Sequence, residues 1–131
     1  MKILQPAGWK RPKGYSNGIS ARGRMLFVSG MVGWNGQEEF VSDAFAEQFD
    51  QALRNIRDVL AEDGARPEHI ARLTMYILDK REYLASLKAI GAAWREVMGR
   101  HYPTMAVVEV RGLMEDRARL EIEATAMVPD A

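Results

Sequence analysis

Hydrophobic and polar residues follow two different periods along this chain, and each period predicts one kind of element. Apolar residues at every third or fourth position are typical of a helix with one buried side, whereas alternation is typical of a half-buried strand. Both periods occur in turn, and together they predict an α+β domain with the element order β-β-α-β-α-β-β.

Two segments carry the helical period. The first follows Ser42 or Asp43, either of which can cap a helix, and ends at Gly64. The second begins at Asp79, which forms a capping-box pattern with Glu82. The expected core-facing residues are Phe45, Phe49, Leu53, Ile56 and Leu60 in the first helix, with Ala52 and Val59 widening the stripe, and Leu84, Leu87, Gly91, Trp94 and Met98 in the second.

Five segments have the composition and pattern of strands, namely residues 15–21, 25–29, 73–78, 106–111 and 117–127. The first two are expected to pair as a hairpin around a turn at 22–24. If the first helix crosses over the sheet, the strand at 73–78 lies parallel to an earlier strand in a βαβ unit. The pattern therefore predicts a mixed sheet of five or six strands.

One face of this sheet is expected to lack a cover within the chain. Crossovers of one hand place both helices on the same face. The strand at 25–29 is apolar on both sides, so its Met and Phe residues would leave an apolar patch exposed in a monomer. We therefore expect the chain to self-associate through the bare face, with any pocket lying between subunits.

Composition limits the domain count and the possible partners. The 131 residues contain no internal repeat or linker and are 47% hydrophobic, which predicts a single domain over 1–131, with a Pro- and Gly-rich arm at 1–14. Lysine plus arginine equals aspartate plus glutamate at 18 each, so no net field favours nucleic acid as a partner. The first 18 residues lack the apolar run of a signal peptide or membrane span, which predicts a cytoplasmic protein without a membrane partner.

Neither a disulfide nor a metal site is expected. The chain contains no cysteine, which excludes disulfides, thiolate ligands and thiol nucleophiles. Its two histidines, His69 and His101, lie far apart and have no companion at ligand spacing. The sequence therefore predicts no metal.

Two carboxylates in the last strand are candidates for chemistry. Glu121 and Glu123 are two residues apart, so both project from one face, opposite Leu120 and Ile122. If the apolar set packs under the helices, the carboxylates face the subunit interface. There they could act as a base or orient water, or they could simply be solvated or ion-paired; the pattern leaves both interpretations open.

A second candidate is the pair Ser29-Gly30, which closes a buried strand and leads into Met31 to Trp34. Glycine lets backbone N–H groups approach a ligand, although a plain turn at a strand end has the same pattern. Tyr15 can aim its hydroxyl into a cleft or simply pack, and Trp34 can lie at a rim or in the core.

Several segments taken together resemble the Rid (YjgF-type) family over roughly residues 15–128. They are Phe27-Val28-Ser29-Gly30, Gln51-Ala52-Leu53-Arg54-Asn55-Ile56, Gly64-Ala65 and Glu121-Ile122-Glu123-Ala124. The resemblance implies a chorismate-mutase-like α+β fold and a homotrimer with a central β-barrel. It also implies a small-molecule ligand in each of three intersubunit clefts, and hydrolysis of reactive imines or enamines such as 2-aminoacrylate without a cofactor.

Carried onto this chain, the resemblance makes Glu121 the acid that positions the attacking water, and Tyr15 and Ser29 residues of the cleft. The family's substrate-clamping arginine is replaced by Met105. Two further polar positions are apolar or altered: the glutamine after Ser-Gly is Met31, and the cleft asparagine falls near Leu87 or Lys88.

The missing arginine predicts altered specificity. An arginine–carboxylate pair contributes about 1.5–3 kcal/mol, and a carboxylate against Met105 would also lose water without gaining a partner. We therefore expect weak or absent 2-aminoacrylate deaminase activity, unless Arg22, Arg24, Arg100 or Arg111 reaches the cleft.

Two functions remain open. The first is hydrolysis of an imine, enamine or related C–N bond in a less acidic or larger metabolite, with Glu121 as the catalytic residue. The second is a non-catalytic binding or regulatory trimer, whose mostly apolar interface pocket is formed by Met31, Trp34, Met105 and Val107. A ribonuclease is disfavoured because the chain has no net positive charge and no paired histidine and base.

Overall fold

The first helical stripe forms α1, Phe45–Ala61, in the computed structural model, which describes residues 1–130. The five main stripe residues and Ala52 are buried, as predicted, whereas Val59 is 37% exposed and lies outside the stripe. Neither Ser42 nor Asp43 is the N-cap residue, because that position belongs to Ala44. The Ser42 hydroxyl instead accepts a hydrogen bond from the Ala44 N–H at 2.9 Å, just ahead of the helix.

The second expected helix is divided into α2, Lys80–Ala85, and α3, Leu87–Met98. Asp79 caps α2 by accepting a hydrogen bond from the Arg81 N–H, but Glu82 does not complete a capping box. The break falls at Ser86, which leaves helical geometry at φ −103° and ψ 6°, and whose hydroxyl donates to the Glu82 carbonyl at 2.8 Å. Trp94 and Met98 are buried in α3, as predicted, together with Ile90 and Val97, whereas Leu84 and Leu87, 51% and 49% exposed, are not in the core.

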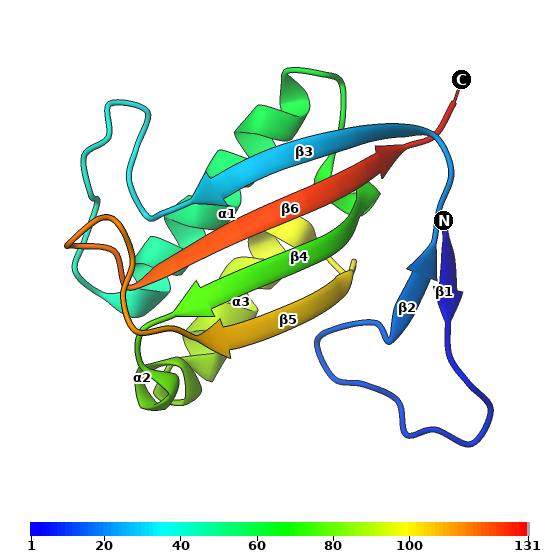
Figure 1. The fold of residues 1–131 in the computed structure, drawn as a ribbon, viewed down its shortest axis with the longest axis horizontal. Coiled ribbons are helices and arrows are strands. Elements are labelled where there is room, and N and C mark those ends of the chain that lie inside the picture. The colour runs from blue at the N-terminus through cyan, green and yellow to red at the C-terminus, as the bar shows by residue number, and fades with distance from the viewer. Residues whose placement is uncertain (131) are drawn as a thin grey trace.

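Four strands form the main sheet in the order β3-β6-β4-β5 (Figure 1). They are β3, Arg24–Met31; β4, Ile70–Ile77, which follows the short 3-10 helix η1, Pro67–His69; β5, Thr104–Glu109; and β6, Leu120–Val128. β6 is antiparallel to both of its neighbours, and β4 and β5 are parallel. The strand after α1 therefore does run parallel to β3, as predicted, but β6 lies between them.

The expected hairpin at residues 15–29 is wrong. A short strand β2, Gly18–Ser20, pairs antiparallel with β1, Lys2–Leu4, in a separate two-stranded sheet. The main sheet therefore has four strands rather than five or six. Ser16 explains the difference, because its backbone N–H donates to the carbonyl of Pro103 at 3.0 Å and holds this segment beside the start of β5.

The helices lie behind one face of the sheet, and the opposite face is bare (Figure 1). Along β6 the residues that face the helices are buried, as predicted: Leu120, Ile122, Ala124 and Ala126. On the bare face, Phe27 is 72% exposed and Met25 is 52% exposed. The strand at 25–29 is thus apolar on both sides but buried within this chain on only one. Among residues 1–130, no helix is long and apolar enough to cross a membrane.

Candidate functional site

Glu121 projects from the bare face of β6, and its carboxylate lies against Gly30 of the neighbouring β3. A Cβ placed on Gly30 would lie 2.2 Å from Glu121 Oε2 and 2.8 Å from its Cδ, well inside van der Waals contact. The pairing of β3 with β6 is interrupted between Val28 and Met31. Ser29 and Gly30 thus lie inside β3, at an irregularity of its pairing, and do not form the turn at a strand end that the sequence also allowed. Only glycine leaves room for the carboxylate here, so Gly30 admits Glu121 against the backbone of β3.

Glu123, two residues further along β6, has a hydrogen-bonding partner within the sheet. Its Oε1 accepts a hydrogen bond from the Tyr76 hydroxyl at 2.6 Å. This hydrogen bond is the main reason that the pKa of Tyr76 is raised, with partial desolvation second. Ser29 lies nearby, in a depression of about 330 Å³ that Arg72 and Glu123 also line. Glu123 is therefore engaged within the sheet, whereas no hydrogen bond from residues 1–130 holds the Glu121 carboxylate.

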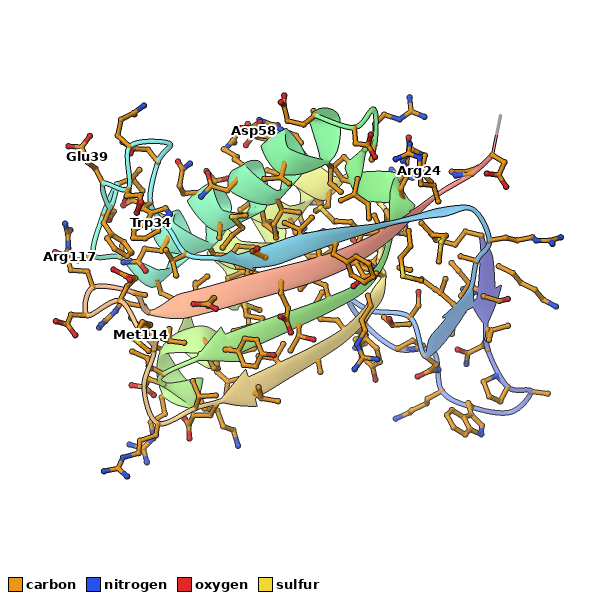
Figure 2. The ribbon with its side chains drawn as sticks, turned by 45° about the horizontal axis from the view of Figure 1, so that its top comes forward. Arg24, Trp34, Glu39, Asp58, Met114 and Arg117 are labelled. Carbon is orange, nitrogen blue, oxygen red and sulfur yellow. The ribbon has the colours of Figure 1, made fainter. Side chains whose placement is uncertain are left out.

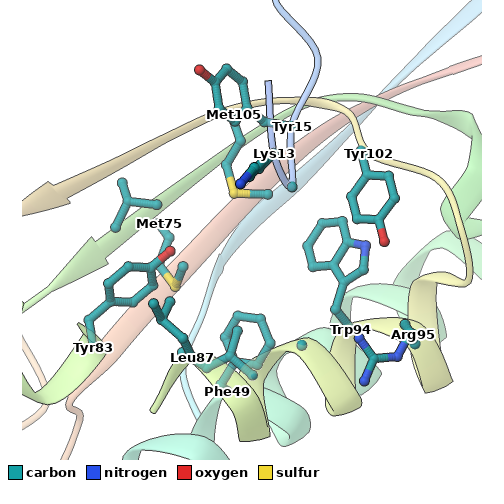
Figure 3. Close-up of a pocket in the computed structure, with 14 residues that line it drawn as sticks. Lys13, Tyr15, Phe49, Met75, Tyr83, Leu87, Trp94, Arg95, Tyr102 and Met105 are labelled. Atoms are coloured by element: carbon teal, nitrogen blue, oxygen red, sulfur yellow. The ribbon is translucent and has the colours of Figure 1, made fainter. Parts of the chain in front are cut away.

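Tyr15, Met105 and Val107 come together on the other side of the sheet. They line a cavity of about 490 Å³ between β5, α3 and the N-terminal arm (Figure 3). The remaining lining residues are Lys13, Gly14, Phe49, Met75, Tyr83, Leu87, Ile90, Gly91, Trp94, Arg95 and Tyr102. Of the two positions suggested for the cleft asparagine, Leu87 lines the cavity and Lys88 does not.

Ser16, just after the arm, holds its neighbour Tyr15 at this cavity. Besides the bond to Pro103, the Ser16 hydroxyl donates to the carbonyl of Tyr102, and Ser16 is buried. The aromatic rings of Trp94 and Tyr102 stack with an interplanar angle of 7° and centroids 6.1 Å apart. Burial raises the pKa of Tyr83 on the opposite side of the cavity, which keeps its hydroxyl protonated.

The cations of the cavity are not those expected from the sequence. None of Arg22, Arg24, Arg100 and Arg111 lines it, and Arg24 is instead paired with Asp63. Lys13 of the arm and Arg95 of α3 do line it. The spacing of Arg95 four residues after Gly91, a glycine inside a helical stripe, was the signal in the sequence that could have revealed it.

Met31 and Trp34 are not part of this cavity. Met31 packs against the hydrophobic core. Trp34 lies in the loop after β3, where its ring is 5.7 Å from that of Phe40, and Arg117 approaches from the loop before β6 (Figure 2). Gly33, expected to admit a ligand, instead admits α1, because a Cβ there would lie 2.5 Å from the Cβ of Gln48.

Both histidines have structural partners. His69 Nδ1 accepts a hydrogen bond from the Arg66 N–H at 3.0 Å, and His101 Nε2 lies 2.6 Å from the carbonyl of Ile70. Within residues 1–130, no group of three or more His, Asp or Glu side chains is arranged to hold a metal ion.

The chain is similar in sequence and in fold to a set of known proteins. The family model described as endoribonuclease L-PSP matches residues 9–128. A RutC family protein of Synechocystis is 30% identical over 98% of both chains, and a human 2-iminobutanoate/2-iminopropanoate deaminase is 25% identical over 79% of this chain and 73% of its own. The structure of a Rid-family protein from Yersinia pestis superposes with a TM-score of 0.85 at 28% identity, covering 97% of this chain and 98% of that one.

Proposed function

We propose that this chain hydrolyses the C–N bond of an imine in a small metabolite. The premise is that the chain belongs to the Rid (YjgF) family, whose model is described as endoribonuclease L-PSP. The observation that carries the proposal is the Glu121 carboxylate, which lies against Gly30 and has no hydrogen-bonding partner among the residues that the structure describes. The name of the human relative, a 2-imino acid deaminase, supports the same reaction class.

In the proposed reaction, Glu121 orients a water molecule and accepts one of its protons as the oxygen adds to the imine carbon, and this proton is passed on to the imine nitrogen to give a carbinolamine. The hydroxyl proton of the carbinolamine then moves to the nitrogen, the C–N bond breaks with its electron pair going to ammonia, and a carbonyl compound remains. Water and imine are thus converted to ammonia and a ketone or keto acid, and no cofactor is required. An enamine would first take a proton at carbon to become the imine.

A homotrimer would bring the two halves of this site together. Within one chain, Glu121 and Gly30 lie on the bare face, whereas Tyr15 and Met105 lie in the cavity on the helical side. β3 and β5 are the two edges of the main sheet. If three sheets close into a barrel with their bare faces inward, the β3 edge of one copy adjoins the β5 edge of the next, and a cleft forms between the two halves.

The proposal is tested by replacing Glu121 with glutamine, which keeps the side chain's size against Gly30 but removes the base. The matched control is Glu123→Gln, because Glu123 lies on the same face but is already bound by Tyr76. We expect Glu121→Gln to slow ammonia release by about a hundredfold or more, and Glu123→Gln to have a small effect. Ammonia release would be followed with imines generated in the assay from several amino acids.

The alternative is a non-catalytic trimer that binds a metabolite. The observation in its favour is that within one chain Glu121 and the cavity lie on opposite sides of the sheet. Equal turnover by the wild type and Glu121→Gln, at the level of the uncatalysed reaction and with ligand binding retained, would support this alternative and contradict the hydrolase.

A further inference from the structure

The cavity between α3 and β5 is larger and more apolar than a very small acid requires. Its volume of about 490 Å³ falls within the range of sites for small organic ligands. An acid the size of pyruvate would leave most of this space empty. Met105 and Leu87 restrict the ligand further, because both side chains are apolar. Neither can form a strong hydrogen bond with a polar group of the ligand that loses its water there.

The cavity nevertheless carries two positive charges and no negative one. Lys13 and Arg95 line it, and none of its lining residues is acidic. Neither cation forms an ion pair with a carboxylate of residues 1–130. Glu96, which follows Arg95 in sequence, is instead paired with Arg54 at 3.3 Å.

The Arg95 guanidinium lies beside Gly91, one helical turn earlier in α3. A Cβ placed on Gly91 would be 3.4 Å from Arg95 Nη1, so the guanidinium folds back one helical turn and lies over this glycine. Gly91 itself lines the cavity. The unpaired guanidinium is therefore part of the cavity wall, in position to bind a carboxylate with two parallel hydrogen bonds.

The aromatic residues define where the rest of the ligand would lie. The indole Nε1 of Trp94 already donates to the carbonyl of His101 at 3.1 Å, so the ring contributes an apolar face. The hydroxyls of Tyr15, Tyr83 and Tyr102 make no hydrogen bond within residues 1–130 and can donate to a carbonyl or imine group (Figure 3). Arg95 lies beside Trp94 and Tyr102, and the apolar side chains of Met75, Leu87 and Met105 line other parts of the cavity (Figure 3). A cation next to aromatic and apolar surface is the complement of an aromatic or bulky apolar organic acid.

We propose that this cavity binds a 2-imino or 2-keto acid with an aromatic or large branched side chain, with its carboxylate on Arg95 and Lys13. The imino acid is the substrate only if the hydrolase proposed above is correct; binding of the acid does not depend on it. Arg95 thus replaces, from α3, the positive charge that Met105 cannot supply from β5.

Calorimetric titration with three related probes tests this assignment. Phenylpyruvate has both the carboxylate and the ring, pyruvate lacks the ring, and phenylacetone lacks the carboxylate. We expect phenylpyruvate to bind at least about tenfold more tightly than either of the others, since it alone engages the cations and the aromatic wall. Equal affinity for phenylpyruvate and pyruvate, or for phenylpyruvate and phenylacetone, would overturn the proposal.

Substitutions locate the binding site. Arg95→Gln is expected to weaken phenylpyruvate binding about ten- to a hundredfold and to leave phenylacetone unaffected. Lys13→Gln, which is also expected to weaken phenylpyruvate binding, gives an independent second test. If circular dichroism shows that Arg95→Gln is unfolded, the affinity of Lys13→Gln for phenylpyruvate decides whether the cations bind the carboxylate. The control is Lys88→Gln, an exposed cation on the same helix that does not line the cavity. Unchanged binding in the folded variants would overturn the proposal.

These keto acids contain no C–N bond, so the outcome is separate from that for hydrolysis. If Glu121→Gln turns over at the wild-type rate while Arg95→Gln loses phenylpyruvate, the hydrolase is contradicted and the ligand assignment stands. If ammonia release depends on Glu121 but phenylpyruvate does not bind, the reverse holds.

Discussion

Gly30 and Gly91 each lie beside a charged group, but only at Gly30 would a side chain collide with that group. The Glu121 carboxylate lies against the first, and the Arg95 guanidinium lies over the second. Glycine inside a regular element costs about 1 kcal/mol relative to alanine. At Gly30 the backbone thus gives up some stability, and the Glu121 carboxylate gains a defined position.

Gly30→Ala should separate activity from stability. The added Cβ displaces the Glu121 carboxylate, so ammonia release should fall about tenfold or more, while the free energy of unfolding changes by no more than about 1 kcal/mol because the displaced atoms end a flexible side chain. Gly36→Ala is the control, since a Cβ there meets no atom within 4 Å. Urea unfolding and the ammonia assay measure the two effects. Unchanged activity in Gly30→Ala would contradict the proposed role of Glu121.

The sequence predicts the direction of Glu121 directly, whereas for Arg95 it offers only the spacing from Gly91. Alternation along a single strand determines which face a residue occupies, so the carboxylates could be assigned to the face opposite Leu120. Arg95 belongs to α3, which begins after the break at Ser86, and that break has no strong signal in the sequence. The same break is why the expected stripe placed Leu84 in the core.

At the scale of the elements, α1 is joined to the rest of the fold by one buried polar side chain. Gln48 is fully buried, and its amide nitrogen donates to the carbonyls of Ser42 and Arg117, at 2.9 and 3.0 Å. Its Oε1 accepts from the N–H of Arg119 at 2.9 Å. The helix is therefore tied both to the segment before it and to the segment that leads into β6.

Gln48→Leu should destabilise the fold even though leucine suits a helical stripe. The substitution would leave the carbonyls of Ser42 and Arg117 and the N–H of Arg119 without their partners in a partly buried site. The expected cost in the free energy of unfolding is on the order of 3 kcal/mol or more. Glu47→Leu, on the exposed neighbouring position of the same helix, should change the free energy of unfolding by less than about 0.5 kcal/mol. Urea unfolding monitored by circular dichroism measures both, and equal effects would contradict this role of Gln48.

Local patterns predicted the existence of the elements better than their pairing. Five of the expected elements are present, within a few residues at their ends. The first helix is α1, and the strands expected at 25–29, 73–78, 106–111 and 117–127 are β3, β4, β5 and β6. The first hairpin was assigned wrongly because pairing depends on contacts distant in sequence. Here the bonds from Ser16 to residues 102 and 103 hold the segment away from β3.

At the scale of the whole molecule, the main feature is the bare sheet face, which in a monomer exposes large apolar side chains to water. Burying a side chain such as Phe27 contributes about 1.5–3 kcal/mol, so three copies closing over this face would gain substantially. The self-association inferred from the sequence thus remains a prediction, now with specific residues at its centre.

Phe27→Asp should abolish the proposed trimer, because closure would bury an unpaired charge on each copy. Sedimentation equilibrium is expected to give a mass of three chains for the wild type and one for the variant. Met114→Asp is the control, since Met114 is 89% exposed in the loop before β6, away from the bare face (Figure 2). A wild-type protein that sediments as a monomer would contradict the trimer.

The position of β6 between β3 and β4 has a consequence for the order in which the sheet can form. β3 and β4 are separated from each other by the strand that comes last in the chain. During synthesis both must therefore remain without their shared neighbour until β6 has left the ribosome. Helix α1 can form and collect apolar side chains early, but the central pairings close late and over long stretches of chain, which is the kind of topology that folds slowly.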